Sequence, residues 1–391
     1  MINNQQPKIL HIITTLTTGG AEMMLLKVLS KMDRESISSE VVCLTDIGTV
    51  GPKIQELGIP VHTIGMRIGR PDLFSIWRFI RLVRRLRPNL LQGWMYHGNL
   101  AAQLSSVFLS PEIPVVWNIR HSIYDLKSEK RLTALIIRMS AFMSKRPSQI
   151  IYNSRTSASQ HEALGIAPHK RIIIPNGFNT ETFSPSENAR AIIRKELGLS
   201  STSILIGFIA RYHPMKDHNN FIQAAAFLSR NYPDVHFLLA GKNVDMNNPE
   251  LTKRVDDVKL NNNIHLLGER RDMSTLTASL DIASSSSFSE AFSNVIGEAM
   301  ACGVPCAVTD VGDSKLLIGE TGKTVPPRDP EALANAWKTF IELGSEGRRD
   351  LGKKARSRIK NVFNMEKIAS QYESLYLKLL HMDISKNSSE P

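Results

Sequence analysis

The stretch DIASSSSFSEAFSNVIGEAMACGVPCAVTDV (residues 281–311) contains, in one piece, the pattern on which the whole chain is built. It opens with a short β-rich segment (281–286), passes through a serine-rich loop into a stretch of helical periodicity (292–302), and ends in an apolar β-rich segment (305–311). Short apolar strands separated by a helix are typical of a parallel sheet that is covered on both faces. The stretch therefore predicts an α/β fold.

The same alternation of strand and helix fills both halves of the chain. In the first half, the predicted strands are residues 8–13, 40–45, 60–65, 89–94, 114–120, 149–154 and 171–177. The predicted helices between them are residues 20–32, 72–87, 98–109, 128–145 and 155–164. In the second half, the predicted strands are residues 204–211, 235–241, 263–268, 281–286 and 305–311. The predicted helices there are residues 216–230, 250–261, 271–279, 292–302 and 330–343.

A polar, proline-containing segment (178–189) separates the two halves and ends in residues suited to begin a new helix. The pattern then restarts, so we expect two doubly wound α/β domains with a linker near residues 180–188. The domains are predicted at residues 1–183 and 184–365. A last helical stretch, residues 366–380, suits either domain, and the polar tail after it is expected to fray.

Composition limits the class of protein. Of the 391 residues, 42% are hydrophobic and 22% are charged, which excludes intrinsic disorder and a collagen-like rod. No apolar stretch approaches the roughly 18 residues of a membrane-spanning helix, and the N-terminus lacks the basic start and apolar core of a secretory signal. The three cysteines cannot form a disulfide framework. We expect a soluble, cytoplasmic protein.

The positive charge is concentrated in the first half. The formal net charge is +11, and residues 1–185 contain 22 Lys and Arg against 12 Asp and Glu. Such an excess favours an anionic partner: nucleic acid, a phosphorylated substrate or an anionic membrane surface. No zinc-finger spacing, helix-turn-helix or aromatic–basic pattern of nucleic-acid recognition is present in the sequence.

The segment DLFSIWRFIRLVRRLRP (72–88) combines apolar and basic residues in helical spacing. Five residues predict a broad apolar face: Phe74, Ile76, Trp77, Ile80 and Val83. Five arginines supply charge: Arg78, Arg81, Arg84, Arg85 and Arg87. This composition suits a helix lying on anionic lipid, and equally a helix that covers the sheet and has a basic outer face. Both interpretations can hold, since only the outer arginines need to contact lipid.

Ligands of doubly wound sheets bind beyond the carboxyl ends of the strands, so the residues after each strand are the candidates. Gly19 and Gly20 follow the first strand and allow backbone amides to approach a ligand closely, or simply form a tight turn. The dinucleotide fingerprint Gly-x-Gly-x-x-Gly is absent, which disfavours a nicotinamide cofactor. Arg211 and Lys216 follow the strand 204–211 and suit a diphosphate, although two solvated surface cations would have the same spacing.

The loop after strand 281–286 carries two carboxylates eight residues apart. Glu290 lies in the loop and Glu298 lies on the helix that follows, with Gly297 beside it to allow a ligand to approach. Carboxylates accept hydrogen bonds from the vicinal hydroxyls of sugars. The residues Phe292-Ser293-Asn294 open the helix and present free amides to an anion. Each glutamate by itself also suits a solvated helix surface.

The string SEAFSNVIGEAMACGVP (289–305) resembles the signature of glycosyltransferase family 4, a group of retaining, nucleotide-sugar-dependent enzymes. Further motifs follow in the family's order: TTGGAE (17–22), GWMYHGNLAA (93–102), NIRHS (118–122) and IARYHPMKDH (209–218). Bacterial capsule and other cell-envelope polysaccharide transferases are similar. The resemblance implies the GT-B fold, in which two Rossmann-like domains face each other across a cleft. It also implies a C-terminal helix, within residues 366–391, that crosses back to the N-terminal domain.

The resemblance also implies roles for individual residues. Arg211 and Lys216 would neutralise the donor diphosphate, Glu298 would hold the ribose, and Glu290 would hold the transferred sugar. The further donor-binding residues implied are Gly19, Gly20, Phe292, Ser293, Asn294 and Val295. The catalytic set implied is His121, Glu290, Arg211 and Lys216. On the acceptor side, the candidates are His97, Asn99 and Arg120, with Arg120 contacting an acceptor phosphate or else pairing with Asp125 or Glu129.

The expected partners are a nucleotide-sugar donor (UDP- or GDP-sugar), a saccharide or lipid-linked acceptor, and an anionic membrane as a peripheral contact. The nucleotide sugar is a co-substrate, so no cofactor is expected, and no Asp-x-Asp motif is present to hold a metal ion. Two alternatives remain at this point. One is a GT-B nucleotide-sugar epimerase or phosphorylase, and the other is a basic nucleic-acid-binding protein.

Overall fold

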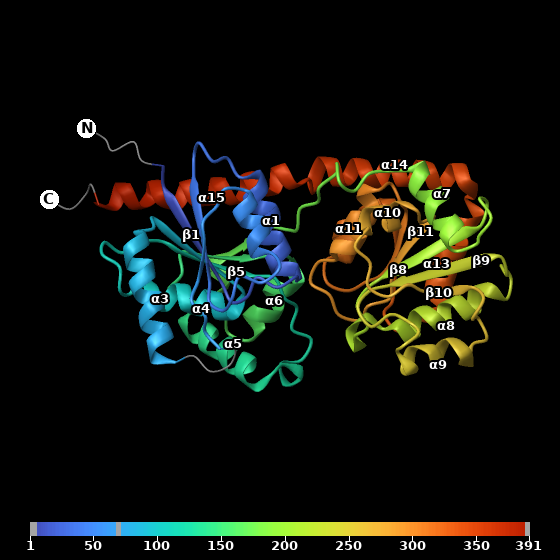
Figure 1. Cartoon of the computed structure of the whole chain (residues 1–391), viewed down its shortest axis with the longest axis horizontal. Coiled ribbons are helices and arrows are strands. Elements are labelled where there is room, and N and C mark those ends of the chain that lie inside the picture. Colours follow the sequence, from blue (N-terminus) through green and yellow to red (C-terminus); the bar gives the residue numbers. More distant parts are fainter. Residues whose placement is uncertain (1–5, 68–71, 388–391) are drawn as a thin grey trace. The chain divides into compact units, whose positions relative to one another are not determined.

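The protein, described by a computed structural model over residues 6–67 and 72–387, forms two compact units. Unit 1 comprises Met1–Gly177 and Met365–Pro391, and unit 2 comprises Phe178–Asn364 (Figure 1). Each unit is built around its own parallel sheet.

In the described residues, the sheet of unit 1 has seven parallel strands in the order β3-β2-β1-β4-β5-β6-β7. The strands are β1 (Lys8–Ile13), β2 (Ser38–Cys43), β3 (Val61–Thr63), β4 (Leu90–Trp94), β5 (Val115–Ile119), β6 (Gln149–Tyr152) and β7 (Arg171–Ile173). The strand order reverses beside β1, and it is at such a reversal that doubly wound sheets open a crevice for ligands.

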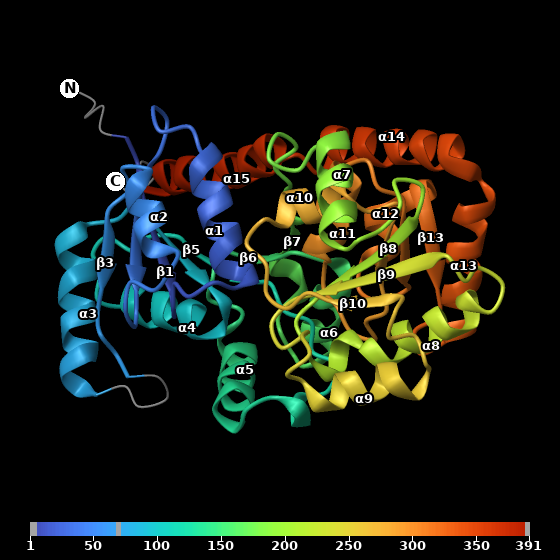
Figure 2. The ribbon, with the colours of Figure 1, turned by 45° about the vertical axis from the view of Figure 1, so that its right-hand side comes forward.

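Helices cover both faces of this sheet (Figure 2). One face packs against α1 (Gly20–Lys31), α2 (Gly51–Glu56) and α15 (Met365–Asn387). The other packs against α3 (Leu73–Leu86), α4 (Met95–Ser106), α5 (Arg131–Met143) and α6 (Arg155–Ala163). Two short 3₁₀ turns are η1 (Leu126–Ser128) and η2 (Pro168–Lys170). Side chains along a strand point alternately to its two faces, so β1 contributes to the core on each side of the sheet. Ile9 and Ile13 pack on the face covered by α1, α2 and α15, and Leu10 and Ile12 pack on the opposite face.

In the described residues, unit 2 repeats this plan with six parallel strands in the order β10-β9-β8-β11-β12-β13. The strands are β8 (Ile204–Ile209), β9 (Val235–Ala240), β10 (Ile264–Leu266), β11 (Ile282–Ser285), β12 (Cys306–Thr309) and β13 (Gly322–Val325). The helices on one face are α7 (Glu187–Glu196), α10 (Met273–Ala278), α11 (Asn294–Ala301), α12 (Ser314–Ile318) and α14 (Gly344–Val362). Those on the other are α8 (His218–Ser229), α9 (Pro249–Asp257) and α13 (Pro330–Glu342). The 3₁₀ turns are η3 (Pro214–Lys216) and η4 (Gly319–Thr321).

The boundary between the units lies six residues before the predicted one, because Phe178 belongs to the core of unit 2. Its ring is fully buried, with its centroid 6.3 Å from that of Phe292, and its amide donates to the carbonyl of Phe363 at 2.9 Å. The chain therefore divides after Gly177, and not after residue 183. After unit 2 the chain re-enters unit 1, where Met365 is buried, so α15 belongs to unit 1.

Three elements of unit 2, namely β13, α14 and the five-residue helix α12, are missing from the sequence-based prediction. The edge strand β13 has the sequence GKTV, which is too short and too polar to produce an apolar alternation. The helix α14 buries only a narrow stripe of small or branched residues, Gly352, Ala355 and Ile359, among many charged ones. A further difference is at the C-terminus, where the helix predicted over 366–380 continues to Asn387 as part of α15.

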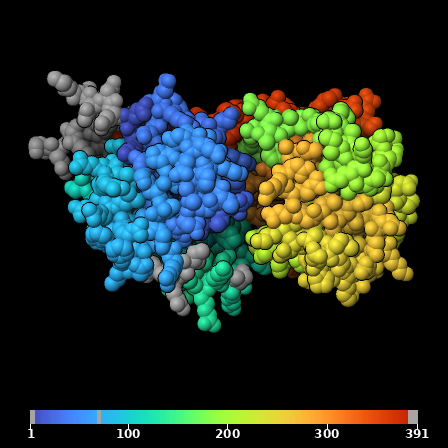
Figure 3. Space-filling model, in the orientation of Figure 1, coloured from blue at the N-terminus to red at the C-terminus, as the bar shows by residue number. Residues whose placement is uncertain are grey.

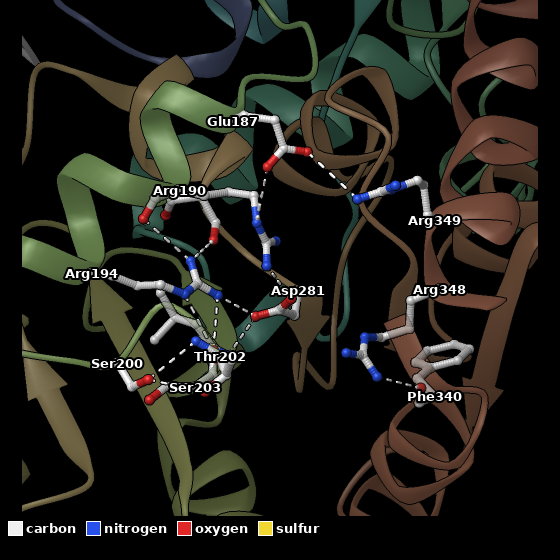
Figure 4. A network of polar contacts seen from close by, with 12 residues as sticks. Glu187, Arg190, Arg194, Ser200, Thr202, Ser203, Asp281, Phe340, Arg348 and Arg349 are labelled. Atoms are coloured by element: carbon white, nitrogen blue, oxygen red, sulfur yellow. Dashed lines mark hydrogen bonds and ion pairs between the residues drawn. The ribbon is translucent and has the colours of Figure 1, made fainter. Parts of the chain in front are cut away.

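A buried ion pair fixes α7 against the amino ends of two strands of unit 2 (Figure 4). The guanidinium of Arg194 pairs with Asp281, and both side chains are less than a tenth exposed. Asp281 also accepts from the amide of Leu205 at 2.9 Å and from Arg190 at 2.8 Å. Because these groups satisfy one another, the network holds α7, β8 and β11 in register at the end of the sheet opposite the carboxyl edge.

Candidate active site

At the carboxyl edge of the sheet of unit 2, the loops after β8 and β11 bring Lys216 and Glu290 together. Lys216 is the last residue of η3, and its ammonium group forms an ion pair with the carboxylate of Glu290. The two side chains are 24% and 17% exposed, so the pair is partly shielded from water. The hydroxyl of Ser287 donates to the same carboxylate oxygen at 3.2 Å.

The serine-rich loop binds its neighbour through backbone and hydroxyl contacts. The hydroxyl of Ser286 lies 3.0 Å from the carbonyl oxygen of Lys216 and 2.9 Å from that of Asp217. The amide of Phe288 donates to the carbonyl of Met215 at 3.0 Å. These bonds fix the loop that carries Glu290 onto the loop that carries Lys216. The serines thus explain how two residues 74 positions apart in the sequence meet.

The amino end of α11 opens beside the ion pair. A small cavity of about 20 Å³ is lined by Lys216, Glu290, Ser287, Ser293 and Val295. The first amides of a helix have no partner within the helix, and the helix dipole makes this end positive. The cavity therefore joins a cation, a carboxylate and backbone donors, which is a combination that suits a ligand with both a phosphate and hydroxyl groups.

Glu298 lies one turn further along α11 and is half-buried, whereas its neighbour Gly297 faces the core. A Cβ atom at Gly297 would overlap the ring of Phe178. The expectation that Gly297 lets a ligand approach is therefore wrong, because the glycine makes room for this ring. Phe292 is also a core residue, 5% exposed, so only its backbone is available to a ligand.

Arg211 follows β8 and is exposed. Its backbone is held by Gly241, whose φ of +148° and lack of a side chain allow it to pack directly on Ala210. His213 caps η3 by accepting from the amide of Met215 at 3.3 Å. The structure thus brings Lys216, Glu290 and the start of α11 together and leaves the side chain of Arg211 at the surface of the same edge.

Gly312, which the sequence analysis did not single out, supports the same loop. Its φ is +58°, and a Cβ atom there would overlap the carbonyl oxygens of Glu290 and Ala291. The amide of Asp313 donates to Ala291 at 3.0 Å. A glycine directly after a strand is the only signal of this role in the sequence, and it does not reveal which loop the glycine contacts.

In unit 1, Gly19 and Gly20 begin α1 at the carboxyl edge of the sheet, directly after the loop that follows β1. Gly19 has an extended backbone, so it is not required for a tight turn. A Cβ atom there would overlap the carboxylate of Glu22, which accepts from Thr15 at 3.3 Å. Burial raises the pKa of Glu22. Gly20 is exposed and leaves the start of the helix accessible.

His121 follows β5 at the same edge and pairs with Glu129. Its Nε2 lies 2.8 Å from the Glu129 carboxylate, and its side chain is 32% exposed. Behind it, His161 donates from Nδ1 to the carbonyl of Ser157 at 2.7 Å, and burial lowers the pKa of His161 to about 4. Neutral His161 therefore accepts from the hydroxyl of Tyr96 at Nε2, 2.7 Å away, which fixes the Tyr96 ring edge-on to His121.

Arg120 bonds three polar side chains that the sequence analysis did not suggest. Its guanidinium donates to the hydroxyl of Tyr372 on α15 at 2.9 Å and also bonds Asn118 and Asn176, and burial lowers its pKa. Of the two partners that the sequence suggested, Glu129 pairs instead with His121. The guanidinium is drawn inside unit 1 because three polar groups there satisfy it. The acceptor-phosphate contact suggested for Arg120 stays a prediction.

Asn99 and His97 lie on α4 but differ in exposure. Asn99 is 1% exposed, and its amide group both donates to the carbonyl of Asn118 at 3.3 Å and accepts from its amide at 3.0 Å. These two bonds join α4 to β5, and the acceptor-side role suggested for Asn99 stays a prediction. His97 is half-buried in the first turn of α4, and burial lowers its pKa.

Two family models match the chain in succession. Residues 18–182 match the model described as Glycosyltransferase Family 4, and residues 203–342 match Glycosyl transferases group 1. The chain belongs to glycosyltransferase family 4.

This glycosyltransferase is similar along nearly its whole length to an Escherichia coli enzyme named UDP-Gal:alpha-D-GlcNAc-diphosphoundecaprenol alpha-1,3-galactosyltransferase, with 23% identity over 95% of this chain and 97% of the relative. It is 30% identical to the Bacillus anthracis N-acetyl-alpha-D-glucosaminyl L-malate synthase over 49% of this chain and 50% of that enzyme. Among solved structures, Anabaena HepE in complex with UDP-glucose superposes with a TM-score of 0.79 at 23% identity, covering 94% of this chain and 99% of HepE. The fold is GT-B.

Two further observations concern the described part of this glycosyltransferase, residues 6–67 and 72–387. None of its helices combines the length and the hydropathy that a membrane crossing requires. Within the same residues, His, Cys, Asp and Glu side chains do not gather in threes as they would around a metal ion.

Proposed function

We propose that this glycosyltransferase moves a sugar from a UDP-sugar to a lipid-linked saccharide acceptor of the cell envelope, with retention of the anomeric configuration. The names of its relatives support this substrate class: the E. coli enzyme is named for a UDP-sugar and a diphosphoundecaprenol-linked sugar, and HepE was solved with UDP-glucose. The proposal includes a cytoplasmic location and contact with the inner face of the plasma membrane.

The observation that carries the proposal is the pairing of Lys216 with Glu290 beside the amino end of α11. Lys216 and Arg211 would bind the diphosphate, together with the amides of residues 292–295. When the glycosidic bond breaks, negative charge develops on this diphosphate, so fixed positive charge there stabilises the transition state more than the ground state. Glu290 would accept from hydroxyls of the transferred sugar, and Glu298 would hold the ribose.

In unit 1, Gly19, Gly20 and His121 are the residues assigned to the donor sugar. The acceptor-side candidates are His97, Asn99 and Arg120. The Glu129 carboxylate orients the imidazole of His121, which is how a histidine is usually held for a defined contact. The departing phosphate would itself take the proton of the acceptor hydroxyl, so the mechanism requires no protein nucleophile.

No metal ion is part of this mechanism. Two cations and the start of a helix balance the charge of the diphosphate, which is the task that a divalent ion performs in other transferases. Transfer should therefore persist in excess EDTA, and activity that disappears in EDTA and returns with Mg²⁺ or Mn²⁺ would contradict this part. Retention is tested on the same reaction by determining the anomeric configuration of the product by NMR.

A thermal-shift titration of the full chain tests the donor class. UDP at 100 times its dissociation constant should stabilise the protein by about 2.7 kcal/mol, and GDP should require a higher concentration. Lys216→Ala should weaken UDP binding at least tenfold and leave the weaker binding of uridine unchanged, since uridine has no phosphate. The matched control is Lys253→Ala, because Lys253 pairs with Asp257 on the exposed face of α9. Equal UDP affinity in Lys216→Ala and the control would contradict the assignment.

A further inference from the structure

Unit 1 contains a cavity of about 640 Å³ enclosed by α3, α4 and α5. Its wall is almost entirely apolar, with Ile80, Leu100, Ala101, Leu104, Phe108 and Leu132 among the lining residues. Leu104 and Phe108 are 48% and 51% exposed, so the cavity opens at the surface between these helices. Protein interiors rarely leave such a volume unfilled, and cavities of this size and lining are typical of sites for apolar ligands.

One end of the cavity is polar and reaches the carboxyl edge of the sheet. Thr14 directly follows β1, Thr45 follows β2, and His97 lies in the first turn of α4, and all three line the cavity. In the described part of the chain, the Thr14 hydroxyl is buried and has no hydrogen-bond partner. Gly19 and His121 lie at this same edge. A ligand that fills the cavity would therefore place its polar end among the residues assigned to transfer.

A cation among the lining residues indicates what kind of apolar ligand fits. Arg67 lines the cavity beside Met66. An apolar wall with a cation at its border suits an amphiphile that combines a hydrocarbon chain with an anionic head. A helix of a partner protein would find no extended groove here, because the apolar surface is concave and enclosed by three helices.

We propose that this cavity binds the hydrocarbon chain of the lipid-linked acceptor, next to its phosphate. The inference rests on the proposed function and adds the part of the acceptor that unit 1 recognises. Binding of the chain inside the protein would hold the acceptor by a part that does not react, and would leave the saccharide at the carboxyl edge.

Alkyl phosphates below their micellar concentrations test the cavity on the full chain by calorimetry. Each methylene that enters an apolar site should improve affinity about fourfold, so decyl phosphate should bind on the order of 200-fold more tightly than hexyl phosphate. Ala101→Trp fills the cavity and should abolish this dependence on chain length. Ala163→Trp is the control, since Ala163 is exposed at the end of α6 and lies outside the cavity.

A second pair of variants keeps the test valid if Ala101→Trp misfolds. Leu104→Asp puts a charge at the opening and should weaken decyl phosphate at least tenfold, whereas Leu164→Asp, at a comparably exposed leucine after α6, should not. Affinity that does not depend on chain length, or that is the same in all four variants, would overturn the inference.

UDP binding and alkyl-phosphate binding, measured in parallel, show whether the cavity inference or the proposed function has failed. UDP stabilisation that persists while alkyl phosphates bind without chain-length dependence overturns the cavity inference and leaves the proposed function standing. Chain-length-dependent binding without any UDP binding supports the cavity and contradicts the proposed donor. If Ala101→Trp also abolishes sedimentation with vesicles of phosphatidylglycerol, the occupant is a membrane lipid and the assignment to the acceptor is wrong. If the variant sediments like the unaltered protein, the assignment to the acceptor is supported.

Discussion

At the scale of single residues, the ion pair with Lys216 gives Glu290 a different task from Glu298. If Glu298 holds the ribose, Glu298→Gln should weaken UDP and the UDP-sugar by a similar factor. A hydrogen bond to a charged acceptor contributes about 1.5–3 kcal/mol, so the loss should be roughly ten- to a hundredfold. Calorimetry with both ligands measures it. A loss seen only with the UDP-sugar would place Glu298 on the sugar and not on the ribose.

Glu290→Gln should behave differently, because it removes the carboxylate that neutralises Lys216. The affinity for UDP should stay the same or rise, since Lys216 then keeps its full charge for the diphosphate. Turnover should fall, because the carboxylate would contact the sugar as its anomeric carbon becomes cationic. Calorimetry with UDP, paired with steady-state rates, distinguishes the two effects. Full turnover in this variant would remove Glu290 from the mechanism.

Gly297 offers a residue-scale test of packing beside the site. Gly297→Ala should destabilise unit 2 by about 1–3 kcal/mol, because the added methyl group overlaps the buried Phe178 ring. In a Phe178→Leu background, Gly297→Ala should cost less unfolding free energy than it does in the unaltered protein, because the smaller side chain leaves room for the methyl group. A double-mutant cycle of thermal unfolding measures this difference. Weaker UDP binding at unchanged stability would instead restore the interpretation of Gly297 as a ligand contact.

At the scale of elements, α3 divides its apolar residues between core and surface. Phe79 and Val83 are buried against the sheet, whereas Phe74 and Trp77 are 64% and 52% exposed. Their rings stack at 5.9 Å, with the guanidinium of Arg81 5.2 Å from the Trp77 ring. The broad apolar face that the sequence suggested is therefore split. The α3 region forms part of the surface of unit 1 (light blue in Figure 3). Exposed aromatic rings beside arginines suit an anionic membrane.

This arrangement predicts membrane binding that Trp77 reports directly. The other three tryptophans, Trp94, Trp117 and Trp337, are fully buried, so a fluorescence change on adding vesicles arises at Trp77. Vesicles rich in phosphatidylglycerol should shift the emission to the blue, and high salt should reverse the shift. Replacing Arg81, Arg84 and Arg85 with Glu should abolish it without altering UDP affinity. If the emission wavelength does not change when vesicles are added, α3 only covers the sheet and does not bind membrane.

At the scale of the whole molecule, buried histidines in both units predict sensitivity to acid. Burial lowers the pKa of His161 and of His218 to about 4 each, from 6.5 in the unfolded chain. The unfolded state therefore binds more protons between these values. The contribution of these neutral histidines to the free energy of unfolding should be fully present above pH 6.5. It should fall towards pH 4, by up to about 1.4 kcal/mol per pH unit for each histidine.

Calorimetric unfolding between pH 7.5 and 5 measures this dependence. His161→Gln keeps the polar contacts of the ring but has no proton to gain, so the transition of unit 1 should become less sensitive to pH. His169→Gln, at an exposed position on η2, serves as the control and should unfold like the unaltered protein. Equal pH sensitivity in all three proteins would contradict the role of His161.

The sequence by itself determined the two parallel sheets and the family. Each predicted strand overlaps a strand of the structure, because a strand buried on both faces must be apolar at nearly every position, and that pattern is local. The string 289–305 was sufficient to identify the family, because it contains a strand end, a loop and a helix start in consecutive residues. Both signals need no information from distant parts of the chain.

Tertiary structure alone decided which side chains meet. The sequence does not show that Lys216 pairs with Glu290, that Glu129 holds His121, or that Tyr372 binds Arg120, because no local pattern records which polar side chains meet. It also does not show the apolar cavity of unit 1, whose wall is assembled from α3, α4 and α5. Such contacts depend on how the elements pack in three dimensions, and the periodicity of a single segment records only that one of its faces is buried.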